Sequence, residues 1–550
     1  MFCYQCQETK SNKYCDKSGI CGKKPTTAAL LDLLLYTAGG LSYFVEHIRK
    51  TGIDVSIADD YVRDALFMTV TNVNFDDNAI EAMIKKGIDL RVSIKSIAKE
   101  KVHGNTEAPC SCVLSEASNY MGGTREEMLA KAETISILSI ENEDVRSLRE
   151  LLIYGLKGVA AYAHHAAMLG YEDKDFYKFM HEVMAYIAWG DLDPAKLQAM
   201  ALDCGKHAVN IMALLDKANT ETFGNQEITT VSRGLKKGKG ILISGHDLLD
   251  LYELLKQTEG KGINIYTHGE MLTAHAYPKL KAFPHLAGHF GGAWHEQQKE
   301  LPDFAGPVLF TTNCIQKPAD SYKDRVFTTG VTGYEGLVHI TSRQDGKEKD
   351  FSAIIEAALN SPDLEDSDNG TLTIGFAKDT VMSVAGAVID AVKSGAITKF
   401  VVMAGCDGRQ KERAYFREVA EKLPKTAVIL TAGCAKYRYN DIDFGDIGGI
   451  PRLLDAGQCN DCYSLAYIAL QLKAAFGLED INDLPLAFDI GWYEQKAVAV
   501  LLALLHLGFK NVRLGPTLPA FLSPNVAKVL VDAFGIQGIT TVDEDLKKLA

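Results

Sequence analysis

Four short apolar runs between residues 399 and 496 each lead into a residue that can bind a metal ion. Runs rich in β-branched residues that end in glycine before a helical pattern predict repeated strand, turn and helix units. The residues that follow the runs are Cys406, Cys434, Cys459 and Glu494. Because they are about 25 to 35 positions apart, one unit each, they should lie at the carboxyl ends of neighbouring parallel strands. Three sulfurs and a carboxylate that converge there indicate a mixed-ligand iron site.

Three further strands are predicted earlier in the chain, and each also ends at a candidate metal ligand. The predicted strands at residues 240–245, 262–269 and 307–313 lead into His246, Glu270 and Cys314. Alone, such residues are more often helix caps, hydrogen-bonded loop residues or buried thiols. Their shared position after a strand is what favours a ligand role.

The first residues of the chain contain a second group of sulfur ligands. Cys3, Cys6, Cys15 and Cys21 form a C-x2-C-x8-C-x5-C motif. A Cys-x2-Cys pair lets two thiolates from one tight turn bind a common centre, and two more cysteines complete a four-sulfur site. Structural zinc is the alternative, but zinc ribbons usually use two Cys-x2-Cys pairs, which the x8 and x5 spacings do not provide. The spacing therefore favours an iron–sulfur cluster over zinc.

The length and charge of the chain limit its class. At 550 residues it is too long for one hydrophobic core, so roughly two to four domains are expected. The formal net charge of −13 argues against nucleic acid and anionic membrane surfaces as partners. The start of the chain shows no signal-peptide pattern, and the most apolar stretch, residues 497–507, is too short to span a bilayer and predicts a buried helix. We expect a cytoplasmic protein whose twelve cysteines serve metal binding or thiol chemistry rather than disulfides.

Helical periodicity dominates the first part of the chain, and strand patterns begin after it. Apolar residues recur with a helical period at residues 28–36, 59–71, 78–98, 125–138, 145–169, 175–188 and 194–215. A helical-bundle domain is therefore predicted for residues 1–220. An acidic, turn-rich stretch at residues 361–370 separates two α/β domains with parallel sheets, at residues 221–365 and 366–550. The run at residues 371–376 is expected to open the second of these domains.

Several residues that can bind metal are given other roles. His164 and His165 are adjacent in a predicted helix and point to different sides of it, so packed or solvated histidines are favoured over joint ligation. Cys462 forms a Cys-x2-Cys pair with Cys459, but only one of them fits the strand-end position, which we assign to Cys459. Ordinary thiols are expected at three isolated cysteines, Cys110, Cys112 and Cys204.

The ordered motifs along the chain resemble those of the hybrid cluster protein family, also called the prismane family. The motifs that carry the resemblance are Gly245-His246-Asp247, His268-Gly269-Glu270, Thr312-Asn313-Cys314, Gly405-Cys406-Asp407, Gly433-Cys434, Cys459-Asn460-Asp461-Cys462 and Trp492-Tyr493-Glu494-Gln495-Lys496. The N-terminal cysteine spacing is similar to the short-spaced form of that family, which carries a [4Fe-4S] cluster. The resemblance covers essentially the whole chain, from residue 3 to residue 496.

The resemblance implies a fold, cofactors and ligands. It implies an N-terminal helical domain and two Rossmann-like domains, with a hybrid [4Fe-2O-2S] cluster where the three meet. The implied ligands of that cluster are His246, Glu270, Cys314, Cys406, Cys434, Cys459 and Glu494. Cys406 would carry a persulfide in the oxidised form, and Lys496 would lie beside the cluster. In an extended segment Lys496 would share a face with Glu494; a solvated lysine at a helix start is the alternative.

The activity that the resemblance implies is the reduction of hydroxylamine to ammonia and water, with nitric oxide as a second candidate substrate. Thiolates stabilise iron, whereas exchangeable imidazole and carboxylate ligands leave room for a small nitrogen molecule. The implied catalytic residues are Cys406, Glu494, Lys496 and His246. The N-terminal cluster would relay electrons from a donor protein that the sequence does not identify.

Two other functions remain open from the sequence. A nickel carbon monoxide dehydrogenase has a similar fold and cluster position, but such chains are typically longer and hold further N-terminal clusters. A non-catalytic iron–sulfur protein, either an electron carrier or a sensor that transfers nitrosyl groups, is the second alternative. The harder ligands argue against a pure carrier, because carriers favour closed all-thiolate clusters.

Overall fold

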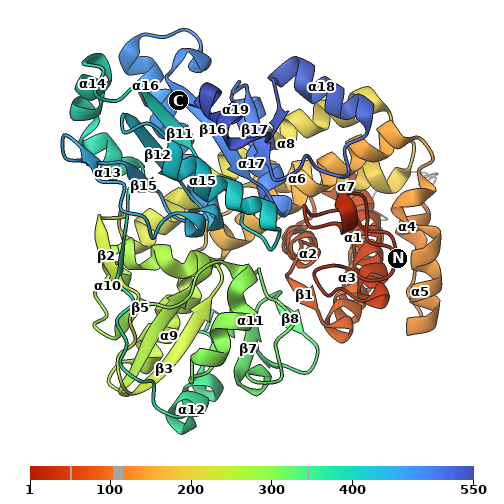
Figure 1. Ribbon diagram of the computed structural model, residues 1–550. Coiled ribbons are helices and arrows are strands. Elements are labelled where there is room, and N and C mark those ends of the chain that lie inside the picture. Colours follow the sequence, from red (N-terminus) through yellow and green to blue (C-terminus); the bar gives the residue numbers. More distant parts are fainter. Residues whose placement is uncertain (50–51, 103–114, 345, 550) are drawn as a thin grey trace.

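The computed structural model describes residues 1–49, 52–102, 115–344 and 346–549. Figure 1 shows helices of the first part of the chain at the right, a green sheet at the lower left and a blue sheet at the upper left. The predicted fold class is confirmed: a helical part is followed by two α/β parts with parallel sheets. Cys110 and Cys112 lie outside the described residues.

The helical part contains every helix that was predicted from the helical periodicity of apolar residues. Its helices are α1 (Pro25–Arg49), α2 (Ser56–Met68), α3 (Asp77–Val102), α4 (Glu116–Asn119), α5 (Arg125–Thr134), α6 (Glu143–Met168), α7 (Lys174–Trp189) and α8 (Pro194–Phe223). Side-chain caps set where the two long central helices begin. Asn142 accepts hydrogen bonds from backbone N–H groups at the start of α6, and Asp193 does so at the start of α8.

The first sheet has six parallel strands in the order β5-β4-β3-β6-β7-β9. Its strands are β3 (Lys239–Ser244), β4 (Ile263–His268), β5 (Leu286–His289), β6 (Val308–Phe310), β7 (Val326–Thr329) and β9 (Val338–Ile340). The strand order reverses at β3, which pairs with β4 on one side and β6 on the other. Ligands of open α/β sheets bind outside the carboxyl ends of strands at such a reversal.

The second sheet has the same kind of topology. Its six parallel strands run in the order β15-β12-β11-β16-β17-β18. They are β11 (Lys399–Val402), β12 (Ala427–Thr431), β15 (Leu453–Asp455), β16 (Leu486–Gly491), β17 (Val512–Gly515) and β18 (Gln537–Gly538). Here the order reverses at β11, between β12 and β16.

The run at residues 371–376 forms a strand, but this strand does not belong to the second parallel sheet. It forms β10 (Thr371–Ile374), which pairs antiparallel with β2 (Thr229–Ser232). Exposed and buried residues alternate along β10, as in an antiparallel pair with one face exposed to solvent. Strands of a parallel sheet are instead covered on both faces. Two short helices follow it, α13 (Lys378–Ser383) and α14 (Ala385–Lys393).

Helix α17 (Gln495–His506) joins the second sheet to the helical part. It is the buried helix predicted at residues 497–507, and it packs against α6 and α8. The approach is so close that a Cβ atom at Gly158 would overlap the carbonyl oxygen of Gln495, and one at Gly205 that of Leu502. The largest apolar core therefore continues from the helical part into the second sheet, and the exact domain limits stay a prediction.

Among the residues that the structure describes, one helix is long and apolar enough to cross a membrane by length and composition, the segment Pro25–Glu46 of α1. Of its most apolar window, 67% is buried inside the structure. Burial of this extent is what a core helix of the bundle shows.

Candidate metal centre

The second sheet presents candidate ligands along one edge. Cys459, Cys434, Cys406 and Glu494 follow β15, β12, β11 and β16, which is also the order of these strands across the sheet. The turn after β11 is made by Gly405, whose φ of 100° favours glycine. The backbone N–H of Cys406 then donates to the carbonyl oxygen of Gly491 at 2.7 Å, which ties the ends of β11 and β16 together.

The first sheet presents its candidates in the same way. Glu270, His246 and Cys314 follow β4, β3 and β6, the strands on either side of the order reversal. His246 is 6% exposed and its Nδ1 lies 2.8 Å from the hydroxyl of Thr312. A contact of this kind sets the orientation of a ligand imidazole and leaves Nε2 free to bind.

The edges of the two sheets meet at one small cavity of about 30 Å³. Its lining includes His246, Glu270, Cys314, Cys406, Cys434, Glu494 and Lys496. Cys459 adjoins it, because single ligand atoms of His246, Glu270 and Cys459 lie within 4.8 Å of one another. The structure thus brings together every residue that the sequence analysis assigned to the central site.

Hydrogen bonds connect the two halves of the site across the cavity. Within the half that the first sheet supplies, His246 Nε2 lies 3.1 Å from a carboxylate oxygen of Glu270. The same oxygen accepts the backbone N–H of Cys459 at 2.7 Å. Asn313 Nδ2 donates to Glu494 Oε1 at 3.4 Å. Residues from both sheets therefore hold each other in place before any metal is considered.

Lys496 is placed differently from either expectation. It is not in an extended segment: Glu494 caps α17, and its carboxylate accepts the backbone N–H of Lys496 at 2.7 Å. It is not solvated either, being 1% exposed. Its Nζ lies 2.8 Å from Asn313 Oδ1 and 3.1 Å from His246 Nε2. The first turn of α17 places this side chain in the lining of the cavity, beside the candidate ligands as the resemblance implied.

The donor set fits an iron cluster electrostatically. Burial raises the pKa of Cys406 to about 12, and burial likewise raises the pKa of Cys434 well above its usual value. Burial also raises the pKa of Glu494, against the opposing charge of Lys496. Thiolates and carboxylates this close together in a dry cavity need more positive charge than one lysine supplies. A multinuclear iron centre provides that charge, and thiolates are its preferred ligands.

The four N-terminal cysteines gather in a loop beside this region. Cys3 and Cys15 form a two-residue antiparallel bridge, with N–H to O=C distances of 3.1 and 2.8 Å. Burial raises the pKa of the Cys6 thiol well above its usual value, and the charges of Cys21 and Cys3 add to the shift. Those contributions arise only between sulfurs that lie near one another.

A zinc ion and an iron–sulfur cluster require different distances between their sulfur ligands. Tetrahedral zinc with bonds of about 2.3 Å holds its sulfurs about 3.8 Å apart. In the described part of the chain, the only trio of metal-binding side chains with all ligand atoms within 4.8 Å is at the central site. The four N-terminal cysteines form no such trio, and the choice between zinc and an iron–sulfur cluster at these residues stays a prediction.

An aromatic pair lies between the two groups of cysteines. The rings of Trp294 and Tyr493 stack with centroids 4.4 Å apart. Both belong to a compact apolar cluster that includes Cys6 of the N-terminal loop and Cys434 of the central site. The indole N–H of Trp294 donates to the carbonyl oxygen of Asp407 at 3.0 Å, next to Cys406. The two sites are thus joined by packed π-systems rather than by solvent.

His164 and His165 bond to different groups, and they are closer to the site than the sequence suggested. Both are 5% exposed in α6 and bond to different carboxylates, His164 to Asp64 at 2.8 Å and His165 to Asp247 at 2.5 Å. The ring of His165 also stacks on that of His246, with centroids 5.6 Å apart.

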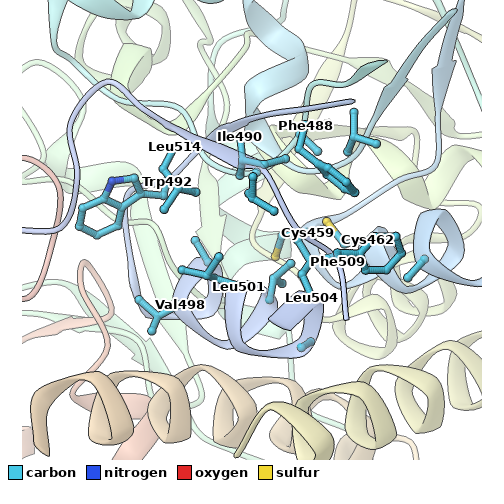
Figure 2. Close-up of a pocket in the computed structure, with 18 of the residues that line it drawn as sticks. Cys459, Cys462, Phe488, Ile490, Trp492, Val498, Leu501, Leu504, Phe509 and Leu514 are labelled. Atoms are coloured by element: carbon cyan, nitrogen blue, oxygen red, sulfur yellow. The ribbon is translucent and has the colours of Figure 1, made fainter. Parts of the chain in front are cut away.

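A separate apolar cavity of about 80 Å³ adjoins the central site. Figure 2 shows Cys459 and Cys462 there, among apolar side chains that include Val498, Leu501 and Leu504 of α17. Cys462 is the first residue of α16 (Cys462–Phe476) and lines this cavity, whereas Cys459 also belongs to the close trio with His246 and Glu270. Cys204 is a buried free thiol in α8.

Sequence reasoning gave no role to several residues that contact the site. Trp294 and His165 lie in segments without a ligand pattern, and no local signal could have found them. Asn313 and Tyr493 each precede a candidate ligand directly, so adjacency alone could have drawn attention to them.

Comparison with known proteins assigns the family. The model of the Prismane/CO dehydrogenase family matches residues 1–547. This chain belongs to that family. It is 55% identical over 547 residues to a hydroxylamine reductase of Clostridium novyi, covering 100% of this chain and 98% of that protein. A hydroxylamine reductase of Parabacteroides distasonis is 54% identical over 550 residues, covering 100% of this chain and 99% of that protein. The resemblance deduced from the motifs is confirmed.

Solved carbon monoxide dehydrogenases share the fold. The Ni-free enzyme of Thermococcus sp. AM4 aligns with a TM-score of 0.56 at 17% identity, covering 99% of this chain and 90% of that chain. Carbon monoxide dehydrogenase IV of Carboxydothermus hydrogenoformans aligns with a TM-score of 0.53 at 14% identity, covering 99% of this chain and 92% of that chain. Identities this low show the fold alone. Membership of the Prismane/CO dehydrogenase family supports the prediction of an iron–sulfur protein, and the type of each cluster stays a prediction.

Proposed function

We propose that this chain reduces hydroxylamine to ammonia and water, a reaction that takes up two electrons and two protons. The observation that carries the proposal is the convergence of thiol, imidazole and carboxylate side chains from two sheets on one buried cavity beside a lysine. Relatives named hydroxylamine reductase, at 54% and 55% identity over the whole chain, support the same activity.

Two clusters are part of the proposal. Cys3, Cys6, Cys15 and Cys21 would hold a [4Fe-4S] cluster. His246, Glu270, Cys314, Cys406, Cys434, Cys459 and Glu494 would hold a hybrid [4Fe-2O-2S] cluster, with Cys406 as the persulfide in the oxidised form. When bound, such a cluster supplies iron for a small nitrogen molecule and electrons for its reduction.

Lys496 is proposed as the proton donor of the reaction. Its ammonium group is held in the cavity by Asn313 Oδ1 at 2.8 Å, and its contact with His246 Nε2 at 3.1 Å would be given up when that nitrogen binds iron. An ammonium group has three N–H donors, so donors are left for the substrate. Glu494 is proposed to release iron when substrate binds, because a carboxylate can bind a metal through one oxygen or two. Lys496 Nζ lies 3.8 Å from Glu494 Oε1 and could pair with the released carboxylate.

Electrons are proposed to reach the central site from the N-terminal cysteines by way of Trp294 and Tyr493. The packed cluster that contains Cys6, Trp294, Tyr493 and Cys434 supports this route. The donor is proposed to be a separate protein. The net charge of −13 and the twelve cysteines favour a cytoplasmic protein without nucleic acid or membrane partners.

Nitric oxide is a second candidate substrate, and the apolar cavity favours it. The cavity reaches Cys406 and Cys459 and is lined almost entirely by apolar side chains. A neutral diatomic molecule partitions into such a space, whereas hydroxylamine, which forms hydrogen bonds with water, does not.

Metal analysis and turnover of the anaerobically purified protein test the proposal. We expect about eight irons per chain, no stoichiometric zinc or nickel, and hydroxylamine-dependent oxidation of a reduced viologen dye. One zinc with about four irons would assign the N-terminal cysteines to zinc, and one nickel would point to carbon monoxide dehydrogenase chemistry. Full iron content without hydroxylamine turnover would refute the proposed activity.

A further inference from the structure

The loop that carries the N-terminal cysteines has a charge opposite to that of the whole chain. Between residues 10 and 24 the only acidic residue is Asp16, in a chain whose formal net charge is −13. The exposed lysines of this loop are Lys10, Lys13, Lys17 and Lys24. We call residues 10–24 the lysine loop. A local patch of one sign on a protein of the other sign orients charged partners towards it.

Two of these lysines are available to a partner. Lys10 lies 3.9 Å from Asp16, and Lys24 pairs with Glu335 at 2.5 Å. Lys13 and Lys17 form no ion pair within the described residues. Their ammonium groups are therefore neutralised only by solvent ions, which an acidic partner would displace.

Apolar side chains stand between the lysines. Tyr14 is 44% exposed and Ile20 is 48% exposed. Tyr14 is held by stacking on Phe2, with ring centroids 4.8 Å apart. Exposed apolar side chains within a ring of charge are typical of protein interfaces, where they supply contact area while the charges set orientation.

The same surface is where the four-cysteine site comes nearest to solvent. Cys3 and Cys21 are only half-buried, whereas Cys6 and Cys15 are buried. Arg409 connects the loop to the interior, because it donates to the carbonyl oxygen of Ile20 at 3.0 Å and its guanidinium lies 5.7 Å from the ring centroid of Trp294. A partner seated on the loop would thus sit at the outer end of the chain of contacts that leads through Trp294.

We propose that the lysine loop is the docking surface for an acidic electron-carrier protein. This rests on the proposed function in one respect, that the four cysteines hold a redox cluster. In each encounter the reduced carrier loses one electron and the N-terminal cluster gains it, so two encounters supply the electrons for one hydroxylamine. Solvated lysines without a partner are the alternative, and they predict no effect of their removal on electron transfer.

The test uses the full-length holoprotein and a reduced plant-type [2Fe-2S] ferredoxin of net negative charge as the probe. Its oxidation is followed by stopped-flow absorbance without hydroxylamine, so the result does not depend on hydroxylamine turnover. The variant is Lys13→Glu/Lys17→Glu. The matched control, Lys393→Glu/Lys425→Glu, changes the net charge equally at exposed lysines of α14, far from the N-terminus in Figure 1, and of the turn before β12.

We expect the second-order rate constant of the variant to fall at least about tenfold at low salt, with the control unchanged. The wild-type rate should fall as salt is added, and that of the variant should depend on salt much less. Iron content and dye-driven hydroxylamine turnover should be normal in both proteins. Equal rates for variant, control and wild type would overturn the docking proposal. Absent hydroxylamine turnover with the dye would overturn the proposed function while the ferredoxin result stood.

Discussion

The N-terminal cysteine site and the central site use the same kind of ligand in opposite ways. The four N-terminal cysteines come from one continuous segment, residues 3–21, and two of them are half-buried. The central candidates come from the ends of seven strands in two sheets, and Glu494 and Lys496 are 3% and 1% exposed. One site is built by a loop on the surface, and the other by the meeting of two sheets in the interior.

This difference matches what each site would have to do. A site that exchanges electrons with a partner protein needs to lie near solvent, and a closed set of thiolates keeps its geometry during the exchange. A site that reduces a small molecule needs exchangeable ligands, a proton donor and protection from water. The two can be altered separately, because the candidate ligands of one are distant in sequence from those of the other.

The largest effect is expected from Cys406→Ala. Loss of this sulfur should lower hydroxylamine turnover at least about 100-fold, because the proposed function gives this group a part in the reaction itself. The electron paramagnetic resonance signal of the N-terminal cluster should persist. Cys204→Ala, which removes a buried thiol of α8 that does not line the central cavity, is the control and should retain turnover. Normal turnover in Cys406→Ala at normal iron content would place the chemistry elsewhere.

A smaller loss is expected from Glu494→Gln. The amide still fits the space and caps α17, so much of the iron should remain, but a neutral group binds iron poorly and cannot pair with Lys496. Turnover should fall about tenfold to 100-fold. Kinetic assays with iron analysis measure this, and Glu335→Gln at an exposed carboxylate is the control. Complete loss of iron would mean that Glu494 serves structure rather than reaction.

Cys6→Ser tests whether the two sites are separate. The spectrum of the N-terminal cluster should disappear, and turnover driven by a protein carrier should slow about tenfold because the relay is interrupted. The signal of the central site should survive, since its candidate ligands all lie beyond residue 245. Electron paramagnetic resonance spectra of the folded variant measure both signals. Loss of both signals together would contradict the view that the N-terminal site and the central site are separate.

The smallest effect is expected from Trp294→Leu. It removes the ring that stacks on Tyr493 between the sites while both ligand sets stay complete. Transfer of an electron from the N-terminal to the central cluster should slow severalfold, as measured by rapid-freeze spectroscopy after reduction. Trp189→Leu, at a tryptophan that is 45% exposed on α7, is the matched control. An unchanged rate would exclude the aromatic pair from the route.

Much of this molecule could be predicted from local sequence patterns. The helices of the first part follow from apolar periodicity, and the strand ends at Cys406, Cys434 and His246 follow from β-branched runs that stop at glycine. These features are set by neighbours a few positions apart along the chain, so they can be deduced without knowledge of the fold. The four-cysteine motif belongs to the same class, because one short segment supplies all four cysteines.

Only the tertiary structure determined how these parts meet. Periodicity placed candidate ligands at strand ends of both sheets, but it did not say that the two edges share one cavity. Neither the stacking of His165 on His246, nor the position of Trp294 between the sites, nor the pairing of β10 with β2 has a local signal. Lys496 shows the reason most clearly. Its direction depends on α17 beginning at Gln495 and lying against Gly158 of α6, more than 300 residues earlier, and such contacts are set by packing rather than by adjacent residues.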